Sequence, residues 1–380
     1  MPVIPFIKRK LGTTYLIWFK SSNLYFQLAE PAWFVFSKIV KRYKTETIAK
    51  QFAYRYSVSL EESLSFVSDI RQKVGEMNQV GILKNNISQH LTDLNKFTFA
   101  PQSIHNYTLG EKTIKFVFDS QQLENYIHLL IDHLETSEDH IEMPLFELFF
   151  FNEKIVFRVN SEVKGIWAND ESHLVKGKIF MELTNLMHSK TDEDWLMTVH
   201  ASAITNGKKT ILFSAAPGSG KTTIAALLQA QGYQLISDDF VPIDRHSFNC
   251  YPLPIAMSVK EGSMQILASL YPALNQKPLN YISPEKSVRY LPAENQLMNL
   301  VYPVHEFIFI QYNKSVDFVW EKLDPVKAIR LLLDQTWVIP TDGNPDLLFD
   351  FVSQKSFYEL SYSNNQKALE AIINLMKHDQ

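Results

Sequence analysis

A short segment of the chain has the residue types that bind the phosphates of a nucleotide. The segment "SAAPGSGKTTIA", residues 214–225, places Gly218 and Gly220 directly before Lys221 and Thr222. Glycine adopts positive φ readily and lets backbone N–H groups approach phosphate oxygens closely. A lysine after such a loop reaches the β- and γ-phosphates, and the next threonine hydroxyl binds Mg²⁺. The segment therefore predicts a site for ATP and Mg²⁺.

The residues on both sides of this loop are those that such a site needs. An apolar strand, "KKTILFSA", precedes it, and a helical pattern, "TTIAALLQAQG", follows it and ends at a glycine. The N–H groups and the dipole of a helix N-terminus attract an anion. Ala215 stands where the usual pattern has its first glycine, and alanine suffices there unless φ must be positive. The residues expected to contact the nucleotide are Pro217, Gly218, Ser219, Gly220, Lys221, Thr222 and Thr223.

Two carboxylates follow the next apolar strand. In "YQLISDDFVPID", residues 233–244, Asp238 and Asp239 end a strand that is expected to lie in the same sheet as the loop. One aspartate can hold Mg²⁺ while the other accepts a proton from an attacking hydroxyl. The alternative is a solvated strand end with two acids and no chemistry.

A histidine precedes the loop in "LMTVHASAITNGKKTILF". Asn206-Gly207 between two apolar runs predicts a β-hairpin, and His200 is expected on its incoming strand. A histidine in this position is either a core residue or a catalytic one.

These residues, in this order and spacing, resemble the kinase domain of the HPr kinase/phosphorylase family. The resemblance covers about residues 195–265, is fainter through "HEFIFIQYN", and favours the HPr-kinase-related serine kinases of peptide-modifying gene clusters. It implies an α/β P-loop kinase core in which Lys221 is catalytic and Asp238 is the general base. It further implies that His200 tunes Asp238 and that Asp239 and Thr222 hold the metal, although the two aspartates could exchange roles.

The chain departs from that family after the aspartates. A Glu–Arg signature supports both reactions of true HPr kinases, and it is missing here. Lys260 in "PLPIAMSVKEG" and Arg289 in "KSVRYLP" are the candidate stabilisers of phosphate charge. HPr as substrate and the reverse phosphorolysis are therefore not expected.

The sequence pattern of residues 1–92 predicts a small α+β module. The runs "TYLIWF" and "LYFQLA" flank the turn "KSSN" as a hairpin, and three helices follow, the first opened by Pro31 and the third by a capping box of Ser59 and Glu62. The module resembles the PqqD-like family, which implies a winged-helix-like domain that holds the leader of a ribosomally made precursor peptide along its exposed sheet edge. The alternative is a packing domain without a peptide.

Composition and length set the remaining expectations. The 380 residues with a net charge of -4 and one cysteine fit several domains in a reducing compartment, with no nucleic-acid partner. No apolar run spans a bilayer, so a cytoplasmic protein without a membrane partner is expected, and a homo-oligomer stays open. The remaining histidines show no zinc-like spacing. The expected organisation is residues 1–92 for peptide recognition, 93–195 as the β-rich part of the kinase, and 196–380 as its P-loop domain, with a polar linker at 84–96.

Together these features predict a transferase, a kinase that moves phosphate from ATP to a Ser or Thr hydroxyl of the precursor peptide. Two alternatives remain open at this stage. One is a kinase of a free small molecule such as serine, and the other is a nucleotide-responsive peptide-binding protein without chemistry.

Overall fold

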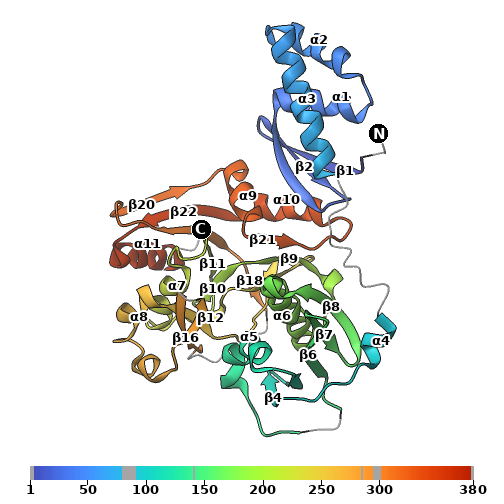
Figure 1. The fold of residues 1–380 in the computed structure, drawn as a ribbon. Coiled ribbons are helices and arrows are strands. Elements are labelled where there is room, and N and C mark those ends of the chain that lie inside the picture. Colours follow the sequence, from blue (N-terminus) through green and yellow to red (C-terminus); the bar gives the residue numbers. More distant parts are fainter. Residues whose placement is uncertain (1–3, 79–90, 140–141, 284–285, 294–300, 378–380) are drawn as a thin grey trace. The chain divides into compact units, whose positions relative to one another are not determined.

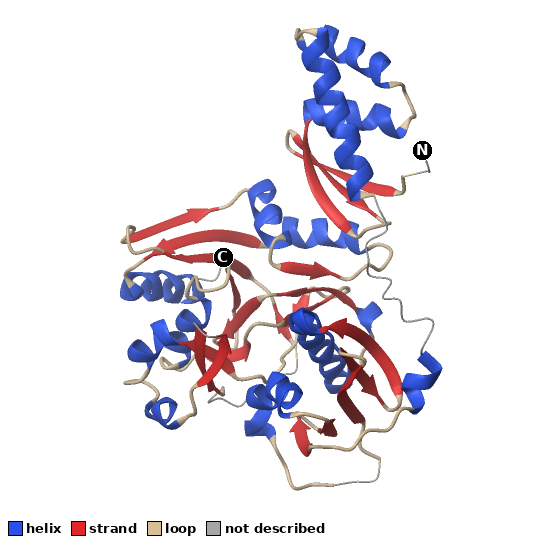
Figure 2. Cartoon of the chain, viewed as in Figure 1, coloured by secondary structure: helices blue, strands red, loops and turns tan. Residues whose placement is uncertain are grey.

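The computed structural model is mixed α/β with several sheets (Figure 1, Figure 2). It describes residues 4–78, 91–139, 142–283, 286–293 and 301–377. The chain forms two compact units. The first contains the described residues before position 79 together with residues 324–333 and 340–354, and the second contains the others.

The first unit is a three-stranded antiparallel sheet with helices beside it. Its N-terminal elements are β1 (Phe6–Leu11), β2 (Thr14–Phe19), β3 (Leu24–Ala29), α1 (Glu30–Val40), α2 (Thr45–Tyr56) and α3 (Leu60–Met77). The predicted β2–β3 hairpin and the three helices are confirmed. Strand β1 was not predicted, because Lys8, Arg9 and Lys10 in succession hide any alternation of apolar and polar residues.

Local sequence explains how these helices begin and what they bury. Pro31 lies in the first turn of α1, and the Ser59–Glu62 capping box opens α3, both as predicted. The apolar side chains that pack between the helices and the sheet include Phe36, Phe52 and Val67. Two helices from far along the chain, α9 (Pro325–Leu333) and α10 (Asn344–Gln354), belong to the same unit. Helix α10 packs on β1, where Arg9 forms an ion pair with Asp346 at 2.7 Å.

The β-rich stretch expected before the kinase core forms a five-stranded sheet of the second unit, in the order β4-β5-β6-β7-β8. Its strands and helices are β4 (Ser103–Leu109), β5 (Lys112–Phe118), β6 (Leu145–Phe151), β7 (Lys154–Val159), β8 (Glu162–Ala168), α5 (Gln121–Ile131) and α6 (Ser172–His188). The sequence predicts helix α6 from the spacing of Leu174, Ile179, Leu183 and Leu186. Ile179 and Leu183 are buried and Leu186 is partly buried, as this pattern predicts, but Leu174 is 44% exposed and the neighbouring Val175 is buried.

The described part of the expected linker is a packed helix. Residues up to 90 of the stretch 84–96 lie outside the described residues, but α4 (Leu91–Lys96) is helical. Arg158 donates to the carbonyl of Leu94 at 2.8 Å and forms a buried two-point ion pair with Glu147. The linker prediction was thus wrong for α4, because a buried cation of β7 binds its C-terminal carbonyls.

A six-stranded sheet carries the glycine-containing loop between β11 and α7, in the order β12-β10-β11-β19-β22-β20. The elements are β10 (Ala201–Thr205), β11 (Thr210–Ser214), α7 (Lys221–Gln229), β12 (Gln234–Ser237), β19 (Glu306–Tyr312), β20 (Phe318–Lys322), β22 (Ser356–Tyr362) and α11 (Asn365–Lys377). Strand β10 is antiparallel to both β11 and β12, so these two strands run in the same direction. Their C-terminal ends therefore lie at one edge of the sheet, which brings the loop and the aspartates together.

Two smaller sheets complete the second unit. One has the order β18-β14-β13-β9-β21, and the other has the order β15-β17-β16. Their elements are β9 (Trp195–Val199), β13 (Val241–Asp244), β14 (Asn249–Cys250), β15 (Met257–Lys260), α8 (Glu261–Leu267), β16 (Asn280–Ser283), β17 (Lys286–Leu291), β18 (Tyr302–Pro303) and β21 (Thr336–Val338). Among the described residues, no helix has the length and apolar character needed to cross a membrane.

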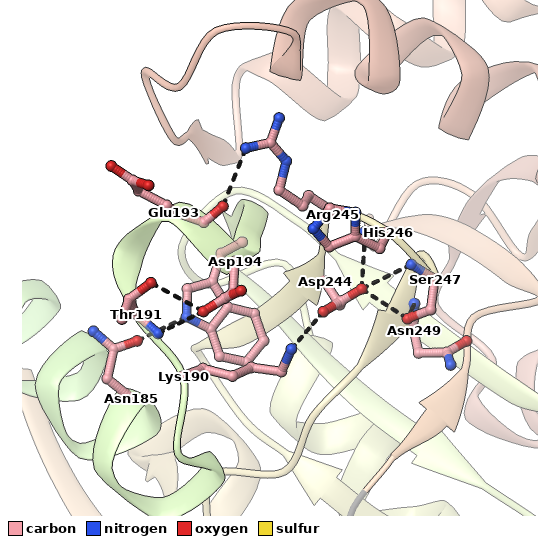
Figure 3. Close-up of polar contacts among 11 residues, drawn as sticks. Asn185, Lys190, Thr191, Glu193, Asp194, Asp244, Arg245, His246, Ser247 and Asn249 are labelled. Carbon is pink, nitrogen blue, oxygen red and sulfur yellow. Dashed lines mark hydrogen bonds and ion pairs between the residues drawn. The ribbon is translucent and has the colours of Figure 1, made fainter.

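A buried aspartate fixes the far end of the strand that follows the Asp238-Asp239 pair (Figure 3). Asp244 accepts hydrogen bonds from the N–H groups of His246 and Ser247 and from the Lys190 ammonium at 2.6 Å. Burial by itself raises the pKa of the Asp244 carboxyl, but Lys190 and Ser247 outweigh it and the pKa is lowered. The carboxylate thereby links β13 to the chain that follows α6.

Replacing Asp244 by Asn should lower the free energy of unfolding by about 3 kcal/mol at pH 7, because it leaves the Lys190 ammonium without its charged partner. Since the folded pKa is lowered, this contribution is present above the unfolded pKa of about 4 and is lost as pH falls through the folded value. Urea unfolding at pH 7 and at pH 3 measures it, with exposed Asp170→Asn as control. The free energies of unfolding of Asp244→Asn and Asp170→Asn should differ less at pH 3 than at pH 7. An equal difference at both pH values would contradict this account.

Candidate active site

The loop between β11 and α7 has the backbone geometry that phosphate binding requires. Gly218 and Gly220 have φ of +90° and +92°, as their residue type allows. The Ser219 carbonyl accepts a hydrogen bond from the Tyr312 N–H at 3.0 Å, which ties the loop to the end of β19. Helix α7 begins at Lys221, directly after the second of these glycines.

The alanine in place of the first glycine is compatible with this geometry. Ala215 is not among the residues with positive φ, so glycine's conformational freedom is not needed there. Its side chain is 5% exposed and packs in the core with Phe213 and Ile224. The condition under which alanine was expected to suffice, a φ that is not positive, is therefore met.

The centre of the site is a buried ammonium group with two partners. The Lys221 side chain is 8% exposed, and its Nζ donates to Asp239 Oδ1 at 2.5 Å. The same Nζ lies 3.1 Å from His200 Nε2. Because an ammonium group has no lone pair, His200 Nε2 accepts this hydrogen bond.

The hydrogen bonds of His200 define a neutral imidazole. Its Nδ1 lies 3.2 Å from the backbone carbonyl of Asp239, which only accepts, so Nδ1 carries the proton and Nε2 does not. Burial and the nearby Lys221 charge lower the pKa of His200, which agrees with that tautomer. His200 lies between β9 and β10, one residue before the hairpin strand on which it was expected. The strand breaks there because β9 and β10 belong to different sheets.

Asp238 faces inward and binds hydroxyl groups. It is 1% exposed, accepts a hydrogen bond from Ser202 Oγ, and accepts another from Thr222 Oγ1 at 3.1 Å. Burial, followed by the negative charge of Asp239, raises the pKa of Asp238. This carboxylate and the first threonine of α7 therefore present oxygen atoms to one point, the donor type that Mg²⁺ prefers.

Asp239 faces the open side of the site. Its side chain is 38% exposed, and its backbone has a φ of +64°, which turns it away from Asp238. Burial tends to raise the pKa of Asp239, but Lys221 and His200 outweigh this effect and the pKa is lowered. The two adjacent carboxylates thus differ in exposure, in partners and in the direction of their pKa shifts.

A cavity of about 620 Å³ lies over the loop and the start of α7. Of the residues predicted for the site, His200, Asp239 and Lys260 line it together with all seven of the loop residues expected to contact a nucleotide. Asp238 is not among the lining residues, but it accepts a hydrogen bond from Thr222, which is. Arg289 is not among the lining residues of the cavity. It lies on β17, paired with Val259 of β15, and its Nη1 is 3.5 Å from Asn275 Oδ1.

Several side chains of the site were not predicted from the sequence. Ser202 lies two residues after His200, and this spacing on a strand could have indicated it. Lys314 and Tyr362 also line the cavity, and Ser263 forms a 2.5 Å hydroxyl contact with Thr223. These last three come from segments far apart in the sequence, and no local pattern marks them.

The chain matches no known protein-family model and no curated protein. Its function must therefore be argued from the site itself.

The contact between Gly220 and Tyr362 allows the loop to be tested. A Cβ on Gly220 would lie 2.5 Å from Tyr362 Oη, whereas one on Gly218 would meet nothing within 4 Å. Both glycines have positive φ, so Gly220→Ala and Gly218→Ala share a backbone cost of about 1–2 kcal/mol. We expect Gly220→Ala to weaken ATP binding more than Gly218→Ala does, as measured by calorimetry.

Tyr362→Phe removes the hydroxyl that would clash, and it should recover part of the ATP affinity lost in Gly220→Ala. Equal losses of ATP affinity in the two glycine variants, with no recovery by Tyr362→Phe, would contradict the prediction. They would show that the contact between residue 220 and Tyr362 does not affect ATP binding.

Proposed function

We propose that the protein is an ATP- and Mg²⁺-dependent kinase that phosphorylates a Ser or Thr hydroxyl of a peptide. The observation that carries this proposal is the meeting of the glycine loop, Lys221, Thr222 and two differently placed carboxylates at one sheet edge. It adds to the resemblance to HPr-kinase-related P-loop kinases. Phosphoryl transfer depends mainly on positioning and charge neutralisation, and these are the properties that such a set of residues provides.

The charges around the cavity favour a triphosphate. Lys260 and Lys314 line it beside Lys221, while Asp239 is the only acidic residue among the described residues of its lining. The α- and β-phosphates would lie on the loop N–H groups and the N-terminus of α7, with Lys221 on the γ-phosphate side. The exposed side chains of Ile266 and Tyr312 on the cavity wall offer apolar surface for the base.

The geometry favours exchanged roles for the two aspartates. Asp238 shares a contact with the Thr222 hydroxyl and is buried, so it fits as a metal ligand together with Thr222. When bound, Mg²⁺ neutralises charge on the β- and γ-phosphates. Asp239 reaches the cavity and can approach an incoming hydroxyl, which fits the general base. The initial assignment had Asp238 as base and Asp239 at the metal.

In the reaction, the acceptor oxygen attacks the γ-phosphorus, the bond to the β-phosphate oxygen breaks and ADP leaves. The acceptor proton passes to the Asp239 carboxylate. Lys221 holds that carboxylate in an ion pair in the present structure. A bound phosphate competes for the ammonium, and loosening the pair raises the basicity of Asp239 at the time it is needed. Neutral His200 keeps the ammonium in place without adding charge.

We assign the first unit to peptide recognition, as a winged-helix-like PqqD-type module. The edge strands of its sheet are β1 and β3. Among the described residues, neither edge strand pairs with a further strand on its outer side. An extended leader peptide can add to such an edge through backbone hydrogen bonds. Tethering the leader raises the effective concentration of the acceptor residue at the kinase site.

The two aspartates can be separated by their effects on metal and on chemistry. Asp238→Asn should raise the Mg²⁺ concentration needed for ATP binding by about tenfold or more. Asp239→Asn should leave Mg·ATP affinity nearly unchanged and lower kcat by about 10²–10⁴-fold. Calorimetry and phosphate-transfer rates measure the two effects, with Asp170→Asn as the exposed control. Full Mg·ATP affinity but no transfer in Asp238→Asn would restore the original assignment.

The substrate class can be tested with three acceptors and ATP. The precursor peptide encoded beside the gene should gain one phosphate by mass spectrometry. The same peptide without its leader should show a KM raised by about tenfold or more, with kcat changed little, because only the tether is lost. Free serine should give no product. Equal use of free serine would indicate a small-molecule kinase, and nucleotide binding with no phosphorylated product would indicate a binding protein.

A further inference from the structure

Outside the nucleotide cavity, two histidines and a glutamate lie close together in the second unit. His105, His128 and Glu135 each offer one ligand atom, and these atoms all lie within 4.8 Å of one another. We propose that this cluster binds a divalent transition-metal ion of the zinc type. Two imidazoles and one carboxylate form a common zinc ligand set that leaves a further position open.

The backbone places these three side chains independently of any ion. His105 lies on β4, His128 on α5, and Glu135 directly after the short helix Asp132–Leu134. Tyr107 and Glu135 form an antiparallel bridge, and the Thr136 N–H donates to the Asn106 carbonyl at 2.9 Å. Since His105 and Tyr107 are two residues apart on one strand, they share the face toward which Glu135 is held.

The charges at this place favour a cation. His105 Nδ1 lies 2.7 Å from Glu135 Oε1, and its Nε2 lies 3.3 Å from Glu124 Oε1. The buried Nε2 of His105 has no hydrogen-bond partner among the described residues. It lies beside the carboxylates of Glu124 and Glu135, so a cation bound here would meet an unsatisfied nitrogen and two negative charges.

A second contact orients the other imidazole. Tyr107 Oη lies 2.7 Å from His128 Nδ1, which leaves Nε2 of His128 for a ligand. Such a partner on the far nitrogen is typical of metal-binding histidines. Bonds of 2.0–2.1 Å put tetrahedral zinc ligands about 3.4 Å apart. The three ligand atoms lie within 4.8 Å of one another, so small side-chain rotations would bring them to that spacing. The rings of His105 and His128 stack with their centroids 4.3 Å apart, and the Glu135 side chain is 45% exposed.

The site would join β4, α5 and the segment after it by one ion, away from the nucleotide, since none of the three ligands lines that cavity. These histidines show no zinc-like spacing along the sequence. Spacing along the sequence does not reveal this site because the three ligands come from three separate elements.

The test is Zn²⁺ titration of the full chain, free of any affinity tag and stripped with a chelator. We expect one Zn²⁺ per chain by calorimetry and a rise in the unfolding temperature. His105→Gln and His128→Gln should each weaken Zn²⁺ binding by about 100-fold or more, and Glu135→Gln by less. Co²⁺ in place of Zn²⁺ should give the visible absorption of a tetrahedral site in the original protein and lose it in the histidine variants.

Two controls separate this site from other zinc binding. The exposed His173→Gln should keep Zn²⁺ affinity, and Asp238→Asn should keep it too, because that residue belongs to the nucleotide site. Circular dichroism confirms that each variant is folded. No saturable Zn²⁺ binding, or unchanged binding in the His105→Gln/His128→Gln double variant, would overturn the proposal. A loss of stability in His105→Gln with no effect of Zn²⁺ on the original protein would overturn it as well, in favour of an imidazolium ion pair.

Discussion

The buried Lys221 ammonium is the constraint around which the candidate active site is arranged. An ammonium group out of water costs several kcal/mol unless it is paired and hydrogen-bonded. Here Asp239 supplies the charge and His200 supplies the lone pair. Both partners depend on how strands end, because His200 lies at the break between two sheets and Asp239 lies just past the end of β12. A bound phosphate would offer the same ammonium a second anionic partner, which couples the nucleotide to the carboxylate electrostatically.

Two adjacent aspartates have different surroundings here because their backbones differ. Asp238 points inward to Ser202 and Thr222, whereas the left-handed backbone at Asp239 turns the next side chain outward to Lys221. Burial and the neighbouring charge raise the pKa of Asp238, while the pKa of Asp239 is lowered. Pairs of titratable groups whose environments push their pKa values apart are typical of sites with distinct acid and base roles.

Much of this region was predictable because its signals are local. The loop glycines, the Asn206-Gly207 hairpin and the Ser59–Glu62 capping box each depend on a few consecutive residues, and the structure contains the geometry each one predicts. What the sequence could not supply is long-range. Tyr362 reaches Gly220 across the sheet, and Arg289 faces Asn275 and not the cavity. Strand β1 and helix α4 were missed because consecutive charges or polar residues hid elements that are stabilised by tertiary contacts.

The membership of α9 and α10 in the first unit has a consequence for biosynthesis. Domains generally fold as units while the chain is being made, and an N-terminal domain usually folds first. Here the strand β1 packs against α10, which follows it only after most of the second unit in the sequence. The first unit therefore reaches its full set of contacts only after α10 has been translated, and a nascent chain that lacks α10 would expose the surface of β1 that this helix covers.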